Sequence, residues 1–239
     1  MEPLKKKLPL HAIHLRLLAL ALMLMDHLWA TVVPGNDWMT FIGRLAFPIF
    51  AFQAAEGYFC TSDRKRYFLR LLVFAIVSEI PFNLLMISNL WFPFRQNVMF
   101  TLLLGLLGIH GMERAKQTGD WWKGLLILVV VTTVGWICFV DHGALGVLTV
   151  LAFGMFRHEK WEKPLQLVTM MFLHGVLAEG RMFLLGPISV PEQALAVFAL
   201  IPIWLYNGEK GPRNRFLQYG SYVFYPAHMV ILHLIRTIW

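Results

Sequence analysis

Long apolar segments, repeated along the chain, restrict its possible folds more than any other feature of the sequence. A helix needs roughly 17–25 mostly apolar residues to cross the hydrocarbon core of a bilayer. Nine segments meet or approach this length: residues 10–33, 39–60, 67–87, 97–113, 121–140, 143–157, 164–179, 191–207 and 219–239. The sixth and seventh are the shortest. We therefore predict an all-α, polytopic integral membrane protein, a bundle of about nine transmembrane helices.

The composition excludes an ordinary soluble domain. Of the 239 residues, 58% are hydrophobic and only 15% are charged, against about 25% charged in soluble domains. The chain is basic, but no basic stripe interleaved with polar residues indicates nucleic-acid binding. No long linker and no repeat of fixed period interrupts it. We expect membrane lipids as its surroundings, no nucleic-acid partner, and a single domain over residues 1–239.

The positions of Lys and Arg predict the orientation of the spans. The N-terminus and every second connection hold Lys5 to Lys7, Arg64 to Arg66, Arg114, Lys116, Lys123, Arg157, Lys160, Lys163, Lys210, Arg213 and Arg215. The opposite connections hold only Arg95, Arg181 and Arg236. Cytoplasmic loops carry such an excess of Lys and Arg. We therefore predict a cytoplasmic N-terminus, an extracytoplasmic C-terminus, and a location in the cell (plasma or inner) membrane.

Small and special residues suggest how the helices pack. Asn97, Thr101, Gly105 and Gly108 share one face of the fourth segment, which favours close approach of another helix. Prolines within or near spans predict kinks or local unwinding; they are Pro48, Pro81 and Pro226. The two cysteines, Cys60 and Cys138, lie in apolar segments without metal-ligand spacing, so we expect core residues and no metal site.

Ionisable side chains inside the apolar segments are the strongest functional signal. An Asp, Lys or Arg near the centre of a membrane helix costs roughly 2.5–3.5 kcal/mol. The titratable groups inside the predicted spans are His14, Arg16, Asp26, His27, Arg44, Glu56, Glu79, His174, His228 and His233. So many polar groups in a chain of this length indicate a hydrated or ligand-filled cavity.

Depth along the helices sorts these groups at about 1.5 Å per residue. Asp26, His27, Arg44, Glu79 and His233 fall together in the outer half of the bilayer. Neighbouring residues of a helix diverge by about 100°, so Asp26 cannot simply orient His27. We expect Asp26 to face Arg44 while His27 faces the cavity.

Some of these groups also have structural explanations, which the sequence leaves open. Arg16 and Glu56 lie about 8–10 Å inward of their span centres and are expected to form an inner ion pair. Glu79 and Asn83, one turn apart, can bond a neighbouring helix. His174 can join two helices, and Tyr225 with His228 can cap a kink at Pro226.

Several short motifs resemble one known family. They are Met25-Asp26-His27-Leu28, Gly43-Arg44-Leu45-Ala46-Phe47-Pro48 continuing to Phe52 with Glu56-Gly57, Ser78-Glu79-Ile80-Pro81-Phe82 with Asn83, Asn97-Val98-Met99-Phe100-Thr101-Leu102, and Tyr225-Pro226-Ala227-His228. These residues resemble the TraX family, named for the F-pilin acetylase. The likeness is spread over the chain and is densest over residues 16–105.

The resemblance implies a small relative of the transmembrane acyltransferases. Such an enzyme takes an acetyl group from cytoplasmic acetyl-CoA to an acceptor amine or hydroxyl at the far face of the membrane. The acceptor itself is not implied: it is a pilin N-terminus, a glycan or a small envelope molecule. Acetyl-CoA is thus the expected co-substrate.

Acyl transfer needs a base and a group that stabilises negative charge. We assign the base to His27, and oxyanion or pantetheine contacts to Arg44, with Asp26 beside it. Glu79 and Asn97 are expected to orient the acceptor or the base. The remaining candidates for substrate or cofactor binding are Arg16, Glu56, Asn83, Tyr225, His228 and His233. Arg64, Lys65 and Arg66 are candidates for the CoA phosphates, although their cytoplasmic position explains them equally well.

Two alternatives remain open from the sequence. Buried charges also form substrate pathways in transporters and lipid-handling membrane proteins. A catalytically idle partner in a membrane complex is the third possibility. Binding of CoA or acetyl-CoA favours the acyltransferase, whereas a pocket that opens alternately to both faces favours the transporter.

Overall fold

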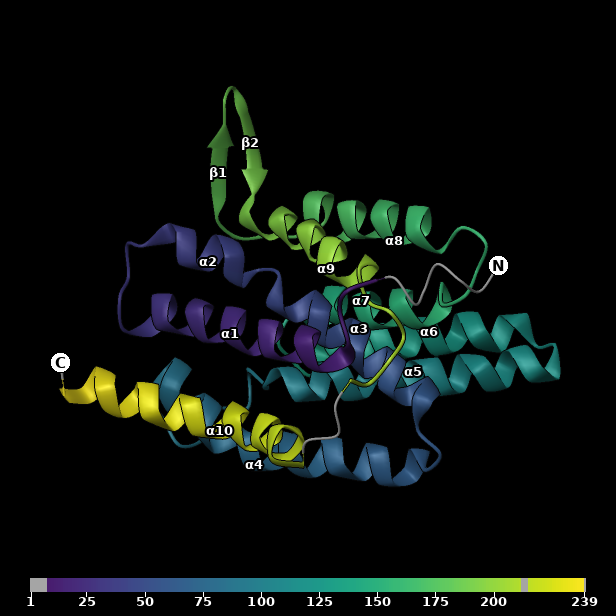
Figure 1. Ribbon diagram of the computed structural model, residues 1–239, viewed down its shortest axis with the longest axis horizontal. Coiled ribbons are helices and arrows are strands. Elements are labelled where there is room, and N and C mark those ends of the chain that lie inside the picture. Colours follow the sequence, from purple (N-terminus) through teal and green to yellow (C-terminus); the bar gives the residue numbers. More distant parts are fainter. Residues whose placement is uncertain (1–7, 212–214, 239) are drawn as a thin grey trace. The chain divides into compact units, whose positions relative to one another are not determined.

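The computed structural model describes residues 8–211 and 215–238, and in these ranges it is mostly helical (Figure 1). Three of the described helices are long and apolar enough to cross a membrane: Ala12–Thr31, Arg64–Ile87 and Val98–Thr118. Shorter apolar helices accompany them. The all-α membrane character predicted from the sequence is thereby confirmed, while the number of crossings and their direction stay predictions.

The chain divides into two compact units. Unit 1 joins both ends of the chain, residues 1–53 and 163–239, and unit 2 is the continuous segment 54–162. The elements of unit 1 are α1 (Ala12–Thr31), α2 (Asp37–Gly43), the start of α3 (Ala46–Cys60), α8 (Glu162–Met170) after its first residue, η2 (Met171–Val176), β1 (Met182–Leu185), β2 (Ile188–Pro191), η3 (Glu192–Ala199), α9 (Leu200–Trp204) and α10 (Arg215–Ile238). Those of unit 2 are the rest of α3, α4 (Arg64–Ile87), α5 (Val98–Thr118), α6 (Trp121–Ile137) and α7 (Gly143–Met155).

The second predicted segment is two helices, not one. The first, α2, ends at Gly43, and α3 begins at Ala46, so the chain breaks at Arg44. Pro48 lies in the first turn of α3, where its missing N–H would have no helical partner in any case. Pro48 therefore produces the predicted interruption, whereas Pro81 and Pro226 lie inside continuous helices.

Two other predicted spans are also composite. The segment 164–179 is an α-helix followed by the π-helical η2, and the segment 191–207 begins as the 3₁₀-helix η3. A 3₁₀-helix rises about 2.0 Å per residue and an α-helix about 1.5 Å, so Glu192–Trp204 reaches about 24 Å. Between them lies an antiparallel hairpin, β1 and β2, which the sequence analysis missed. It was missed because apolar residues occupy both faces, so no polar alternation marks the strands.

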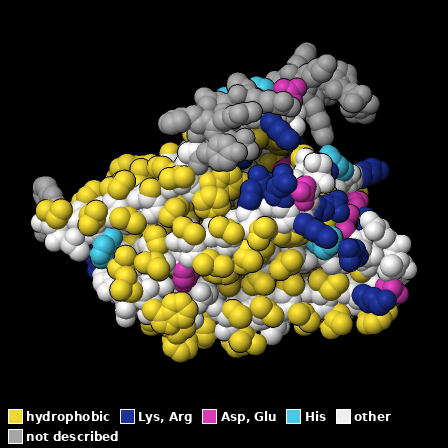
Figure 2. All heavy atoms as spheres, turned by 90° about the horizontal axis from the view of Figure 1, so that it is seen from below, with side chains coloured by type: hydrophobic (Ala, Val, Ile, Leu, Met, Phe, Trp, Pro, Cys, Tyr) yellow, Lys and Arg dark blue, Asp and Glu magenta, His cyan; other side chains and the backbone are white. Residues whose placement is uncertain are grey.

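Much of the described surface is apolar, as a lipid-facing protein requires. Figure 2 shows a face covered mainly by hydrophobic side chains, with Lys and Arg gathered toward one end. Large apolar side chains are exposed on most helices, for example Leu69, Ile76, Val129 and Ile201. Both cysteines are exposed as well, so the expectation of core residues was wrong. In a membrane an apolar segment has an outer face too, and an apolar position there need not be interior.

Close packing in unit 2 depends on the small face of α5. A Cβ atom added to Gly105 would lie 2.5 Å from Cβ of Val150 on α7, and one added to Gly108 would lie 2.7 Å from Cδ2 of Leu151. Thr101, on the same face, donates its hydroxyl to the carbonyl of Asp141. The predicted packing role of this face is confirmed.

We expect Gly105→Ala to destabilise the protein by about 1–3 kcal/mol, the usual range for an overpacked core. The facing Val150 is β-branched and has little freedom to turn away. Gly124→Ala on α6 is the matched control, since its new Cβ would meet only Cβ of Ala115 at 3.9 Å. Denaturant or detergent titration of the two variants measures the difference. Equal stabilities of the two variants would contradict the packing role. Adding Val150→Ala to Gly105→Ala should recover part of the lost stability, because it removes the side chain that the new Cβ meets.

A second expected result concerns topology. If the nine predicted segments all cross the membrane, residue 211 and the C-terminal end lie on opposite sides, because only the last segment separates them. A fluorescent reporter that folds in the cytoplasm should be active when fused at Gly211, and alkaline phosphatase should be active when fused after Trp239. The same reporter active at both points would refute the nine-span arrangement.

Candidate functional site

A polar layer joins α1 to α2 in unit 1. Asp26 on α1 accepts a hydrogen bond from the hydroxyl of Thr40, with 2.7 Å between Oγ1 and Oδ1. Arg44 donates to the same Thr40 hydroxyl at 2.7 Å, and its Nη2 lies 3.4 Å from Oδ1 of Asp26. The Asp26 and Arg44 side chains are 25% and 23% exposed, and Thr40 is fully buried. The predicted contact of Asp26 with Arg44 is confirmed, and Thr40 bridges it.

Glycine at position 43 makes this layer possible. A Cβ atom there would lie 2.5 Å from Cβ of Asp26 and 2.9 Å from its Oδ1. Any larger residue would force α2 away from α1 and separate the pair. The Gly-Arg sequence therefore has a physical basis: the glycine admits the carboxylate and the next residue meets its charge.

One nitrogen of Arg44 finds no partner in the part of the chain that the structure describes. Its Nε is buried and makes no hydrogen bond there, whereas Nη2 donates to Thr40. A buried guanidinium N–H without an acceptor is costly. Because this nitrogen is closed to solvent, a bound molecule can reach it only if neighbouring side chains move, and the contact between Arg44 and the substrate stays a prediction.

The second feature of unit 1 is a pair of histidines. Nδ1 of His27 lies 2.8 Å from Nε2 of His228 on α10, and the two ring planes are within 9° of parallel. Nδ1 of His228 lies 2.8 Å from the carbonyl oxygen of Phe224. His228 is almost fully buried, and Tyr225 packs against its ring. From the sequence His228 was a candidate for substrate or cofactor binding, and the structure places it directly against His27.

The carbonyl of Phe224 determines which nitrogens carry protons. A carbonyl only accepts, so Nδ1 of His228 must be the protonated nitrogen and, in the neutral ring, Nε2 must be an acceptor. His27 therefore donates from Nδ1, and its Nε2 carries the lone pair. The fixed carbonyl of α10 thus selects the His27 tautomer in which Nε2 is basic.

Unit 2 holds a different polar cluster around Glu79. Its Oε2 accepts from the backbone N–H and the side-chain amide of Asn97, at 3.2 and 2.6 Å, and its Oε1 accepts from Asn83 at 3.3 Å. Asn97 also caps α5 and bonds the carbonyl of Ala75. These bonds tie α4 to the start of α5. The structural explanation of Glu79, a hydrogen bond to a neighbouring helix, agrees with these contacts. The catalytic role of Glu79 stays a prediction.

The inner ion pair is different from the one predicted. Glu56 is bound by Arg157, with 2.7 Å between Oε1 and Nε, and not by Arg16. Arg157 follows α7 and also stacks on the ring of Phe59. Because this pairing joins the two ends of unit 2, its partners lie 101 residues apart, and helix depth alone does not indicate it.

The three basic residues proposed for CoA begin α4, and all are exposed. The guanidinium of Arg64 lies 4.6 Å from the ring centre of Tyr58, whose hydroxyl bonds His110 at 2.9 Å. Asp63 caps the helix by accepting from the backbone N–H of Arg66 at 2.9 Å. Because that carboxylate occupies the helix N-terminus, a phosphate here would be held by side chains rather than by backbone N–H groups.

Two further candidate histidines, His174 and His233, are both in unit 1. His174 is buried in the π-helical η2, and its Nδ1 lies 3.3 Å from the amide nitrogen of Gln193 on η3. This contact joins two elements, as the sequence allowed. His233 on α10 has a buried Nδ1 that finds no hydrogen-bond partner among the described residues.

Comparison with known proteins now identifies the family. The family model described as "TraX protein" matches residues 12–236, nearly the whole chain. The chain belongs to the TraX family. A similar protein from Dichelobacter nodosus, called "Probable fimbrial assembly protein FimC, serogroup H1", is 26% identical over 242 residues, covering 96% of this chain and 97% of the relative. "Uncharacterized protein RP591" from Rickettsia prowazekii is 24% identical over 149 residues, covering 61% and 56%. No solved structure matches.

In this TraX-family chain the sequence missed two parts of the site. Thr40 lies one helical turn before Arg44, and that spacing alone was its signal. The hydrogen bond between His27 and His228 left no signal in the sequence, because its partners are 201 residues apart.

Proposed function

We propose that this TraX-family protein is a membrane-embedded acetyltransferase that uses acetyl-CoA and modifies an amine or hydroxyl of an envelope molecule. The observation that carries the proposal is the hydrogen-bond chain from His27 through His228 to the Phe224 carbonyl. It holds His27 in the tautomer with a basic Nε2, which is the nitrogen that a general base uses.

The proposed reaction needs one proton acceptor and one anion-stabilising group. Nε2 of His27 takes the proton from the acceptor amine or hydroxyl while that nitrogen or oxygen attacks the thioester carbonyl of acetyl-CoA. The oxyanion that forms accepts a hydrogen bond from the Arg44 guanidinium. The carbon–sulfur bond then breaks, the CoA thiolate takes the proton from His27, and the acetylated acceptor leaves. Asp26 holds Arg44 by charge, and Thr40 holds both.

The name of one relative suggests which acceptor to test first. The Dichelobacter relative is named for fimbrial assembly, so a pilin-type subunit with a free N-terminal amine is the acceptor we test first. We place the protein in the inner membrane, with acetyl-CoA reaching it from the cytoplasm past Arg64, Lys65 and Arg66. Their exposed positive charges suit the CoA phosphates.

The direct test uses the purified protein in lipid nanodiscs with acetyl-CoA and a pilin N-terminal peptide. We expect release of free CoA thiol and a peptide heavier by one acetyl group, both absent with an N-terminally blocked peptide. Mass spectrometry of envelope fractions from a deletion strain extends the test to other acceptors. Failure to bind acetyl-CoA, together with solute movement across proteoliposomes, would reject the enzyme in favour of the transporter alternative.

His228 gives a sharper test of the proposed base. His228→Gln can still accept from Nδ1 of His27 through its amide oxygen, so we expect it to keep most of the activity. His228→Phe cannot accept a hydrogen bond from Nδ1 of His27, so His27 is no longer held in one tautomer. We expect acetyl transfer to fall by at least about tenfold, because loss of tautomer control also lowers activity in catalytic triads. Equal activities of the two variants, both folded and both binding CoA, would contradict the tautomer argument.

A further inference from the structure

The hairpin of unit 1 has no role in the proposed reaction, and its surface is unusual. Its strands pair Met182 with Pro191, Phe183 with Val190 and Leu184 with Ser189. No charged residue occurs over 182–191, and the turn is Gly186-Pro187. Leu184 is 77% exposed and Ile188 is 63% exposed. An isolated two-stranded hairpin with such side chains in water is at best marginally stable.

Charged residues hold the foot of the hairpin. Arg181, directly before β1, bonds Glu192, directly after β2, with 3.2 Å between Nε and Oε1. Its Nη2 also lies 3.2 Å from Oδ2 of Asp37 at the start of α2, and its guanidinium covers the ring of Trp29 on α1. The ring of Phe183 packs on Phe41. The foot is therefore fixed to the end of α1 and to α2, close in sequence to Asp26 and His27.

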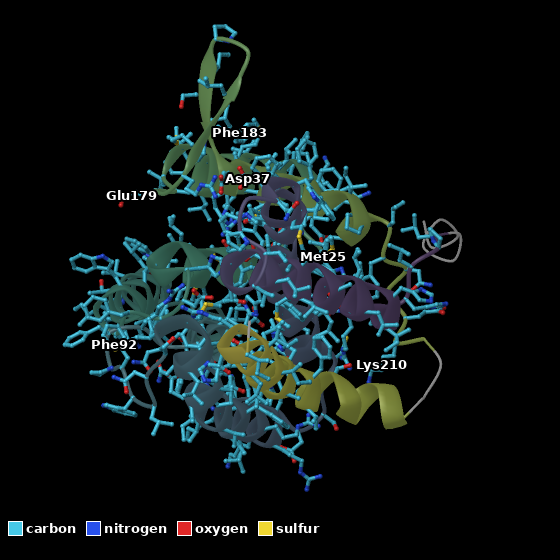
Figure 3. All side chains as sticks on the ribbon, turned by 90° about the vertical axis from the view of Figure 1, so that its left-hand side faces the viewer. Met25, Asp37, Phe92, Glu179, Phe183 and Lys210 are labelled. Atoms are coloured by element: carbon cyan, nitrogen blue, oxygen red, sulfur yellow. The ribbon has the colours of Figure 1, made fainter. Side chains whose placement is uncertain are left out.

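The strands point across the helices of unit 1. In Figures 1 and 3 the hairpin extends away from α1 and α8, across their axes rather than along them. Figure 3 places Phe183 at the foot, near Asp37. Because α1 is a candidate membrane span, a hairpin that runs across it lies along the plane of the membrane.

We propose that the hairpin 182–191 lies in the membrane interface, at the leaflet beside the C-terminal end of α1, with its strands along the membrane plane. The apolar side chains of both faces, Leu184 on one and Ile188 on the other, then contact lipid. Exposed apolar side chains also occur on the elements before and after the hairpin in the chain: Val168, Phe172 and Val176 precede it, and Phe198 and Ile201 follow it. Exposed apolar surface of this kind is typical of a membrane contact, so lipid is the occupant that suits the hairpin.

The backbone and the charged foot set the depth. Each strand of a two-stranded sheet has one unpaired edge, and unpaired N–H and C=O groups are not tolerated in the hydrocarbon core. The Arg181 side chain is 53% exposed, and an exposed charge needs water or headgroups. The hairpin therefore lies at the boundary of headgroups and acyl chains, with the edges solvated and the side chains inserted.

A protein partner fits this surface less well. A stable protein interface covers roughly 800 Å² on each side and has a polar rim. Two strands of four residues are too small for that area, and their apolar tip has no polar rim. Lipid requires neither.

Spin-label accessibility tests the proposal without any enzyme assay. In a background of Cys60→Ser and Cys138→Ser, a nitroxide is attached to Leu184→Cys or Ile188→Cys in phosphatidylcholine vesicles. Leu125→Cys on α6 is the lipid-facing control, and Lys210→Cys in an exposed connection is the aqueous control. Collision with oxygen reports lipid, and collision with a water-soluble nickel chelate reports water.

We expect both hairpin labels to give oxygen-to-nickel ratios close to that of the Leu125 label. The ratios should place the hairpin labels at a shallower depth in the bilayer than the Leu125 label. The ratios should not change with salt or with added anionic phosphatidylglycerol, because the hairpin is uncharged. Ratios matching the Lys210 label would overturn the proposal. A label that is immobile and inaccessible to both reagents would also overturn it, since that result means cover by protein.

Discussion

Replacing His27 with Gln will lower acetyl transfer by about 10²–10⁴-fold, the usual contribution of a positioned general base. Glutamine nearly keeps the shape of the side chain but has no nitrogen that accepts a proton. Folding and CoA binding should be unchanged, because His27 is a partly exposed side chain and not part of the packed core. Single-turnover transfer from acetyl-CoA, measured beside a CoA-binding isotherm, separates the two effects.

A second histidine near the start of the same helix supplies the control for this variant. His14 is exposed on the same helix, where its Nδ1 accepts from the backbone N–H of His11. His14→Gln should therefore keep full activity. A protonated imidazole has no lone pair with which to accept a second proton, so wild-type transfer should fall in acid. An active His27→Gln enzyme with the same loss of activity in acid would sink the assignment.

Neutralising either Asp26 or Arg44 will destabilise the folded protein by about 2–3 kcal/mol. A fully buried pair costs about 3–5 kcal/mol when one partner is removed, and here about a quarter of each side chain is exposed. Asp26→Asn leaves the Arg44 charge partly buried, and Arg44→Gln leaves the Asp26 carboxylate. The double variant removes both charges, so its loss should be smaller than the sum of the single losses by at least about 1 kcal/mol.

Detergent titration followed by tryptophan fluorescence gives the four free energies of this cycle. Repeating the cycle in a Thr40→Val background tests the bridge, because this substitution removes the hydroxyl that bonds both charged groups. We expect that variant to weaken the coupling between Asp26 and Arg44. Strictly additive losses would show that the two charges do not interact. As a control, the exposed pair of Lys116 and Glu159 should show little coupling.

Some parts of the fold follow from the sequence because their causes are local. Apolar length predicts membrane helices, and Pro48 predicts the break before α3. The small face of α5 predicts close packing, since glycine admits a neighbour wherever that neighbour comes from. The contact of Asp26 with Arg44 follows for a similar reason: two adjacent spans place two opposite charges at one depth.

Other parts depend on contacts between distant segments, and for these the sequence was silent or wrong. The charge of Glu56 and its depth in the membrane are compatible with an ion pair to Arg16 as well as to Arg157, the partner that the structure shows. The hairpin 182–191 has no polar alternation, because its environment is not water on either face. The positions of the strands are decided by the ion pairs of Arg181 at their foot.

The sequence by itself determined that this chain is a helical membrane protein of the TraX family, with Asp26 and His27 near the end of its first span and Arg44 near the start of its second. Only the tertiary structure decided the proton arrangement of His27. That arrangement depends on the Phe224 carbonyl of α10 and on His228, which lies 201 residues from His27. Hydropathy and helical spacing describe neighbours along one helix, whereas a hydrogen bond between α1 and α10 exists only once the two helices have packed.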